Sequence, residues 1–525
     1  MKGKLLFVFA LLVLVSAYSF AQEQDSISPK TTIVYLEHAD VLSYDKELNP
    51  DAQKLKGNVC FRHDSAYMYC DSAYFYEEKN SLEAFSNVRM VQGDTLFVYG
   101  DYLVYNGNVE MAKLRNNVRM VNNQVTLYTD SLNYDRAANV GYYFDGGRIV
   151  DEENVLSSIF GKYLPDTKLA VFNDSVKLEN PQFTLYSDTL EYSTSSKIAT
   201  ILGPSVIVSD SGTVHTSRGW YDTANGKSSL LDRSKVISGN RILTGDSIAY
   251  NRTSGFGEAF GNMSICDTLQ KVTLEGNYGF YNELTEYAFV TDQARFMEYS
   301  KNDTLYLHAD TLEMVTVDSV YREIKAFHGV RFYRVDIQGV CDSLQFNTRD
   351  SVLYMFNDPI LWNEEYQMLG DTILVFMNDS TVEYVHVKDY AYAAQYLDTT
   401  YYNQLKGSDL KAYFDGQSVR QIDVSGNAEL IYYPLENDGV MAGHNTSKGG
   451  YLSIWLKENK LERLKIWPTP VGLLTPIPDL KPEQKELQDF KWFDYLRPKD
   501  KDDIFTVHKR EGKSDKPKRS NKFVH

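Results

Sequence analysis

Aspartate recurs in this sequence at an almost fixed interval near 29 residues, and side chains of this type could bind metal ions. Each Asp opens a phrase of the form Asp-x-Leu-x-Tyr, and carboxylates repeated in this way could form a ladder of calcium sites. Calcium solenoids of the nonapeptide type need dense Gly-Gly-x-Gly-x-Asp spacing, however, and the sequence contains none. An Asp that follows Gly, Ser, Thr or Ala at the start of a strand usually bonds its own backbone in an Asx turn. We therefore interpret the column as corner residues and predict no metal site. The phrase begins at Asp40, Asp71, Asp101, Asp130, Ile159, Asp188, Ser217, Asp246, Asn277, Asp310, Asp342, Asp371 and Asp409.

The sequence offers no recognisable catalytic constellation. It lacks a Gly-x-Ser-x-Gly elbow, a His-Glu-x-x-His helix, a phosphate loop, a dinucleotide fingerprint and a Cys-x-x-Cys pair. Its carboxylates are spread over turns, so no glycosidase pair can be nominated. Histidines have no fixed place in the repeat, and we expect those at positions 63, 215, 308, 328, 386 and 444 to be surface or rim residues. The sequence predicts a protein that is not an enzyme and binds no cofactor.

Four cysteines in an exported chain of this size do not make a disulfide scaffold. Cys60 and Cys70 flank a turn-like His-Asp-Ser and could meet across a hairpin or remain free. Cys266 and Cys341 lie more than two repeats apart, and we expect them to be buried as small hydrophobic residues.

The repeat predicts the fold class. Nine of its 13 fifth positions are Tyr, and most third positions are Leu, Ile or Gly. Because strand side chains alternate between faces, the third and fifth positions share one apolar face. A second phrase, as in Asn87-Val-Arg-Met90, Asn117-Val-Arg-Met120 and Gly329-Val-Arg-Phe332, should place Val and Met inward and Arg outward. We predict an all-β, elongated repeat β-jellyroll or solenoid of about 13 rungs, with a Pro-rich C-terminal cap.

The inward columns predict a long apolar lane. Its third position carries Gly161, Gly219 and Gly279 in alternate repeats, so a bulky neighbour could fill each gap or the gap could be real space. An unfilled gap would accommodate an apolar ligand such as an acyl chain. The candidate lane residues are Leu103, Tyr105, Val118, Met120, Leu132, Tyr134, Leu190, Tyr192, Ile248 and Tyr250.

Composition changes along the chain predict its domains. Residues 1–21 look like a secretory signal peptide, with two Lys before an apolar run that is too short to span a membrane. Residues 31–465 hold the repeats, 466–500 are Pro-rich, and 501–525 form a basic tail that we expect to be disordered. A short helix near 483–496 should cap the last rung with Leu487, Phe490, Phe493 and Leu496 on one side. The net charge of −17 argues against nucleic acid and anionic membrane surfaces as partners.

Two phrases carry a resemblance to a known family. Leu55-Lys-Gly-Asn-Val59 and Thr95-Leu-Phe-Val-Tyr-Gly-Asp-Tyr-Leu-Val-Tyr105 are similar to the OstA-like family of lipopolysaccharide transport proteins, as in LptA and the N-terminal domain of LptD. The likeness covers about residues 31–465, as one OstA-like domain or as several in succession. It implies an open jellyroll that cradles the acyl chains of lipid A, and it implies strand edges that bind other transport proteins. This chain has many more repeats than a single bridge protein.

The resemblance implies non-enzymatic binding and transport of lipopolysaccharide to the outer membrane, by a protein that is periplasmic or peripheral to that membrane. No transmembrane segment is expected after signal removal. Two rival functions remain open. A carbohydrate-binding or carbohydrate-active β-solenoid would use exposed Trp220, Trp362 or Trp455 as sugar platforms, and an envelope scaffold would bind no ligand.

Overall fold

The computed structural model describes residues 32–47, 49–299, 303–318, 320–378, 381–398, 400–416, 418–436, 440–457 and 460–510. The expected signal peptide, 1–21, and the end of the expected tail, 511–525, lie outside these residues. The chain forms two compact units, Met1–Ala170 (unit 1) and Val171–His525 (unit 2). Within the described ranges, no helix is long and apolar enough to cross a membrane.

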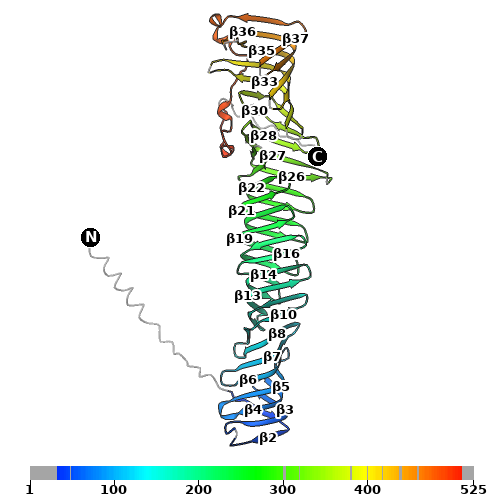
Figure 1. The fold of residues 1–525 in the computed structure, drawn as a ribbon, viewed down its shortest axis with the longest axis vertical. Coiled ribbons are helices and arrows are strands. Elements are labelled where there is room, and N and C mark those ends of the chain that lie inside the picture. The colour runs from blue at the N-terminus through cyan, green and yellow to red at the C-terminus, as the bar shows by residue number, and fades with distance from the viewer. Residues whose placement is uncertain are drawn as a thin grey trace, which may run out of the picture. The chain divides into compact units, whose positions relative to one another are not determined.

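In its described residues, unit 1 consists of antiparallel strands and one 3-10 turn, and its last strand continues into unit 2 (Figure 1). Its elements are β1 (Tyr35–His38), β2 (Val41–Tyr44), β3 (Gln53–His63), β4 (Ala66–Tyr76), η1 (Glu77–Lys79), β5 (Ser81–Gln92), β6 (Leu96–Asn106), β7 (Met111–Asn122), β8 (Val125–Asp135), β9 (Val140–Tyr143), β10 (Gly147–Asp151), β11 (Asn154–Ser158), β12 (Phe160–Leu164) and β13 (Leu169–Asn180).

Unit 2 repeats the same antiparallel pattern and ends in four 3-10 turns. Its elements are β14 (Phe183–Ser193), β15 (Ile198–Ile201), β16 (Ser205–Ser209), β17 (Gly212–Thr216), β18 (Arg218–Asp222), β19 (Lys227–Ser238), β20 (Arg241–Asn251), β21 (Phe256–Asp267), β22 (Val272–Asn282), β23 (Tyr287–Thr291), β24 (Arg295–Tyr299), β25 (Thr304–His308), β26 (Thr311–Val317), β27 (Tyr321–Arg334), β28 (Ile337–Asn347), β29 (Val352–Phe356), β30 (Ile360–Asn363), β31 (Tyr366–Leu369), β32 (Thr372–Asn378), β33 (Thr381–Tyr396), β34 (Tyr402–Asp415), β35 (Ser418–Tyr432), β36 (His444–Lys457), β37 (Lys460–Trp467), β38 (Val471–Thr475), η2 (Ile477–Asp479), η3 (Pro482–Gln484), η4 (Asp494–Leu496) and η5 (Asp503–Phe505).

A bend near the middle of the long strands creates two layers. In β5 the bend falls at Ser86 and Asn87, whose φ values of 61° and 53° are left-handed, and the pairing with β4 and β6 shifts register there. Asn, Asp and Gly adopt this conformation at low cost. One half of each bent strand joins the layer that carries the Asp-x-Leu-x-Tyr phrases, here called the tyrosine layer. The other half joins the layer that carries the Val-Arg-Met phrases, here called the arginine layer.

The Asp column lies at this corner. Asn87 Nδ2 donates to Asp71 Oδ2 at 2.7 Å, and Asn117 Nδ2 donates to Asp101 Oδ2 at 2.6 Å. The prediction of corner residues is confirmed, but these carboxylates accept from the left-handed Asn of a neighbouring strand, where we had expected an Asx turn. The described part of the chain contains no group of three or more His, Cys, Asp or Glu side chains that could hold a metal ion. The same pair recurs at Asn58 and Asp40, Asn262 and Asp246, and Asn357 and Asp342.

The two layers bury the inward columns against each other. Leu103 and Tyr105 of the tyrosine layer and Met90 of the arginine layer are almost completely buried, while Arg89 is exposed, as the alternation predicts. In the last repeat, Leu410 and Ala412 are buried and Tyr413 faces outward against Arg420. The first position of this repeat is Ser408, whose hydroxyl donates to the Gly426 carbonyl at the corner. The prediction that the phrase begins at Asp409 is therefore wrong by one residue.

The segment after the last strand, residues 477–510 (the C-terminal segment), packs on the outer surface of the arginine layer in unit 2 (Figure 1, orange to red). Leu487, Leu496 and Ile504 are buried there. The prediction of a helix over 483–496 that caps the last rung is therefore wrong. Packed structure also continues through residues 501–510, which we had assigned to a disordered tail.

Buried glutamines explain why the C-terminal segment is extended. Gln404 Nε2 donates to the Lys485 carbonyl at 2.9 Å, and Gln404 Oε1 accepts from the Leu487 N–H at 2.8 Å. Gln367 holds the segment in the same way six residues later, at Lys491 and Phe493. A side-chain amide that pairs with both a carbonyl and an N–H replaces the hydrogen bonds that a helix would make internally.

Acidification is expected to loosen the end of the C-terminal segment. The ring of His308 packs against Phe505, and its Nδ1 donates to the Ala294 carbonyl at 2.8 Å. Burial, aided by Arg331, lowers the pKa of His308, so the stability from neutral His308 is present above the ordinary value of about 6.5 and is lost as pH falls below it. Hydrogen exchange of residues 499–508, corrected for intrinsic rates, should be faster at about pH 5.5 than at pH 7.5.

A second histidine, His508, lies nearby at 3.1 Å from Asp503, so a variant must isolate the effect of His308. His308→Gln keeps a neutral side chain at both pH values and should remove most of the difference. Equal protection of the unmodified protein at the two pH values would contradict the assignment.

Candidate functional site

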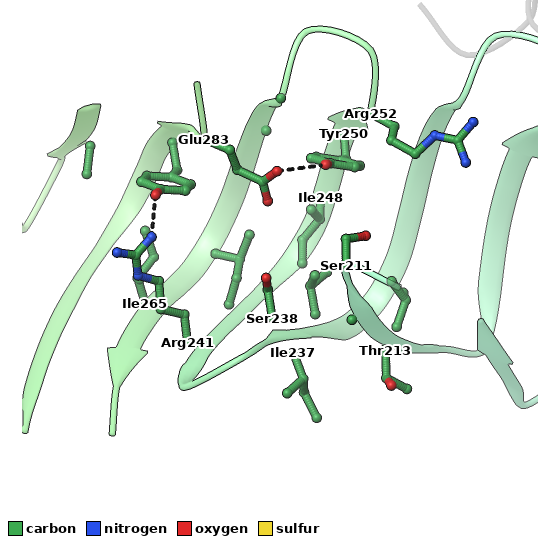
Figure 2. A pocket seen from close by; sticks show the side chains of 18 of the residues that line it. Ser211, Thr213, Ile237, Ser238, Arg241, Ile248, Tyr250, Arg252, Ile265 and Glu283 are labelled. Atoms are coloured by element: carbon green, nitrogen blue, oxygen red, sulfur yellow. Dashed lines mark hydrogen bonds between the residues drawn. The ribbon is translucent and has the colours of Figure 1, made fainter. Parts of the chain in front are cut away.

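A cavity of about 370 Å³ lies between the two layers in unit 2, and it is the main candidate for a binding site. Apolar side chains from the inward columns form most of its wall (Figure 2). The tyrosine layer contributes Tyr221, Leu230, Ile248, Tyr250, Tyr281 and Met314. The arginine layer contributes Ile207, Val214, Val236, Leu243, Ile265 and Leu274.

Polar residues form the rim, where the strand ends of the two layers face each other. Tyr250 donates to Glu283 at 3.2 Å, and Arg241 of the arginine layer donates to the hydroxyl of Tyr281. Figure 2 shows Tyr250, Glu283 and Arg241 at this rim. Two further arginines cross the same gap from the tyrosine layer, Arg252 to Gln182 and Arg322 to Gln270. An apolar interior with arginines along its opening can hold a ligand that has an apolar body and an anionic head.

The tyrosines at the rim are neutral. Burial, reinforced by Glu283, raises the pKa of Tyr250 to about 12. Burial also raises the pKa of Tyr281, although Arg241 opposes this shift. The charges at the opening therefore belong to the arginines and to carboxylates such as Asp267, which lies 3.7 Å from Arg241.

The structure places two of the ten lane candidates at this cavity. Ile248 is 1 % exposed and Tyr250 is half-buried, and both line it. The other eight candidates are 2 % exposed or less, and none of them lines it: Leu103, Tyr105, Val118, Met120, Leu132, Tyr134, Leu190 and Tyr192.

The gap between the layers is closed in unit 1 by a buried polar group, here called the His63 cluster (His63, Gln92, Tyr105, Tyr134 and Arg136). Arg136 donates to Tyr105 Oη at 2.6 Å and to His63 Nδ1 at 2.9 Å. Tyr134 donates to Gln92 Oε1 at 3.0 Å. Because Arg136 can only donate, His63 Nδ1 is an acceptor and its proton is on Nε2. The side chains of one layer are thus hydrogen-bonded to those of the other.

Histidine positions differ from the expectation of surface or rim sites. His63 is 0 % exposed, and His308 and His444 are also buried. No sequence pattern indicated this burial, because none of the three histidines has a fixed place in the repeat.

The glycines of the third position do not widen the lane. A Cβ at Gly161 would lie 2.4 Å from the ring of Tyr143, and one at Gly279 would lie 2.3 Å from Met263 Cε. Of the two alternatives for these glycines, a filled gap and an empty one, the structure shows that neighbouring side chains fill the gap.

Two other expectations concern the cysteines and tryptophans. Cys60 faces outward opposite Tyr69, whereas the adjacent inward position pairs Val59 with Cys70, so the two thiols lie on opposite faces and are free. Cys341 is buried as expected, but Cys266 is only half-buried. Trp362 is 0 % exposed beside the C-terminal segment, so it cannot be a sugar platform.

Sequence reasoning missed the arginines that cross the gap. Two of them follow a column tyrosine by two residues, in Tyr134-Asp-Arg136 and Tyr250-Asn-Arg252. This recurrence was the available signal, because a residue two positions beyond an inward side chain at a strand end lies at the turn and faces the opposite layer.

Comparisons with known proteins found matches to part of the chain. Residues 31–188 match the family described as OstA-like protein. Among solved structures, the chain is similar to LptH from Pseudomonas aeruginosa, described as the LptA homologous periplasmic component of the lipopolysaccharide transport device. The two share 13% identity over 27% of this chain and 95% of that one, with a TM-score of 0.21. No curated protein matches the chain. The family match therefore identifies residues 31–188 as an OstA-like region of this chain.

Proposed function

We propose that the protein is a non-enzymatic carrier that binds lipopolysaccharide and passes it across the periplasm toward the outer membrane. The observation that carries the proposal is the apolar cavity between the layers of unit 2, with Ile248 in its wall and Arg241 at its rim. The OstA-like match of residues 31–188 supports the same class of function. Energy for transport is supplied by other proteins, and no cofactor takes part.

The cavity suits the acyl chains of lipid A. Each methylene group that leaves water contributes about 0.8 kcal/mol, so a few methylenes outweigh the cost of ordering a flexible chain. The arginines at the rim provide planar donors that match phosphate oxygens. Arg252 and Arg322 hold neutral glutamines, which an anionic head group can displace without separating an ion pair.

The other lane candidates extend this proposal along the chain. In unit 1 they become accessible only if the His63 cluster opens, since the layers are bonded together there. Partner proteins of the transport system would bind at strand edges. At the N-terminal end, β1 and β2 pair with β3 and present exposed Val41, Leu42 and Tyr44.

Native mass spectrometry with lipid extraction tests the proposal on mature protein purified from cell envelopes. We expect an acylated, phosphorylated glycolipid to co-purify in an approximately stoichiometric amount. An empty protein that also fails to take up added lipopolysaccharide would refute the carrier function and favour an envelope scaffold.

A further inference from the structure

The outer surface of the arginine layer in unit 1 carries a regular row of aromatic and basic side chains. Tyr and Arg alternate from strand to strand, and each of these residues is the direct cross-strand neighbour of the next. Their register is continuous through five pairs of strands. The row, here called the Tyr-Arg row, consists of Tyr69, Arg89, Tyr99, Arg119, Tyr128 and Arg148.

Each arginine of the row stacks on a tyrosine and remains exposed. The guanidinium carbons of Arg89 and Arg119 lie 4.4 Å from the ring centroids of Tyr69 and Tyr99, and Arg148 is held in the same way. Stacking orders the guanidinium groups while their N–H groups stay available. In a chain whose net charge is −17, this is a local concentration of positive charge.

The matching row in unit 2 is covered by the chain itself. Arg331 occupies the same place in Gly329-Val-Arg-Phe332 that Arg89 and Arg119 occupy in their phrases, one residue past the Val at the corner. Arg331 Nε donates to the Ile504 carbonyl of the C-terminal segment at 2.5 Å.

Its cross-strand neighbours in this row bind the same segment. His308 pairs with Arg331 and with Arg295 in the ladder. Arg295 lies 3.9 Å from the carboxylate of Asp502 and 5.8 Å from the ring centroid of Phe505, and His308 packs against Phe505. A basic row on this layer thus receives an acidic and an aromatic side chain from an extended peptide.

The same chemistry recurs farther along unit 2. Lys406, on the outer surface of the arginine layer, lies 3.6 Å from the carboxylate of Asp489 and donates to the Gln488 carbonyl at 3.1 Å. Basic positions of the layer therefore contact an acidic side chain of the segment at two places, at Asp489 and at Asp502.

We propose that the Tyr-Arg row of unit 1 is a docking surface for an extended acidic and aromatic segment of a partner protein. The docked segment would lie across the strands, with carboxylates on Arg89 and Arg119 and aromatic rings beside the exposed guanidinium groups. The contacts of residues 485–506 in unit 2 are the internal template for this mode. The surface is separate from the interior cavity, so docking does not depend on lipid binding.

Fluorescence anisotropy with a synthetic peptide of residues 485–506 tests the proposal on the full mature chain. We expect saturable binding that weakens as salt rises. Arg89→Glu with Arg119→Glu should reduce the affinity by about tenfold or more, because two attractive contacts become repulsive. The matched control, Arg218→Glu with Arg233→Glu, makes the same charge change at exposed positions elsewhere and should have little effect.

The peptide could instead displace the chain's own C-terminal segment, so a photoreactive group at the position of Phe493 must report where it binds. Cross-links to residues 62–150 support docking on the Tyr-Arg row. Cross-links confined to residues 331–431, equal binding by the two double variants, or absence of binding would overturn the proposal. Retention of an anionic polysaccharide by the row, with no binding of the peptide, would overturn it too.

Discussion

Replacement of Ile248 by Asp is expected to remove lipid from the purified protein. Ile248 is 1 % exposed and forms part of the cavity wall. A carboxylate at this position would face the acyl chain, and an unpaired charge in apolar surroundings costs several kcal/mol. We expect bound lipopolysaccharide to fall at least a hundredfold, which corresponds to about 2.7 kcal/mol. Lipid extraction with mass spectrometry, and titration with added lipopolysaccharide, measure the change.

Two further variants separate loss of binding from loss of fold. Val208→Asp makes the same change at a side chain that is 43% exposed, beside the inward Ile207, and should retain lipid. Ile248→Trp fills the cavity without adding charge and should also exclude lipid while the circular dichroism spectrum is preserved. Normal lipid content in both Ile248 variants would show that the cavity is not the site.

Replacement of Arg136 by Ala is expected to open the gap between the layers of unit 1. The guanidinium group donates to Tyr105 and His63, and Arg136 is 6 % exposed. Its removal leaves buried polar groups without their charged donor, and hydrogen bonds to charged groups are worth about 1.5–3 kcal/mol each. We expect local stability to fall by about 3 kcal/mol. Hydrogen exchange of β3, β6 and β8 measures this opening separately from unit 2.

Arg119→Ala is the matched control for Arg136→Ala. Arg119 is exposed and makes one cation–π contact with Tyr99, so its loss should cost about 0.5–1 kcal/mol. Similar exchange rates in the two variants would show that the His63 cluster does not hold the layers together. An Arg136→Ala protein that stays folded and takes up more lipopolysaccharide would indicate that the closed part of the lane can be opened.

The repeat made most of the fold predictable. Alternation at Leu103 and Tyr105 placed these side chains inside, and the phrase around Arg89 placed its arginine outside. The C-terminal segment was not predictable in the same way. The spacing of Leu487, Phe490 and Phe493 suits a helix, but the backbone bonds of this segment go to Gln404 and Gln367. Those partners lie 83 and 126 residues away in sequence, beyond the reach of any local pattern.

The strands, their corners and their inward and outward faces could be predicted from local sequence patterns. These features depend on the two-residue period of a strand and on the left-handed conformations that Asn and Gly tolerate, and both are local properties of the chain. Whether the interior is filled or open depends instead on contacts between residues far apart in the sequence. In unit 1, Arg136 donates a hydrogen bond to His63, which lies 73 residues earlier in the sequence, and this contact closes the gap between the layers. Around Ile248 the side chains from the two layers leave a cavity. The difference lies in non-local packing between layers, where residues that look equivalent in the repeat meet different partners.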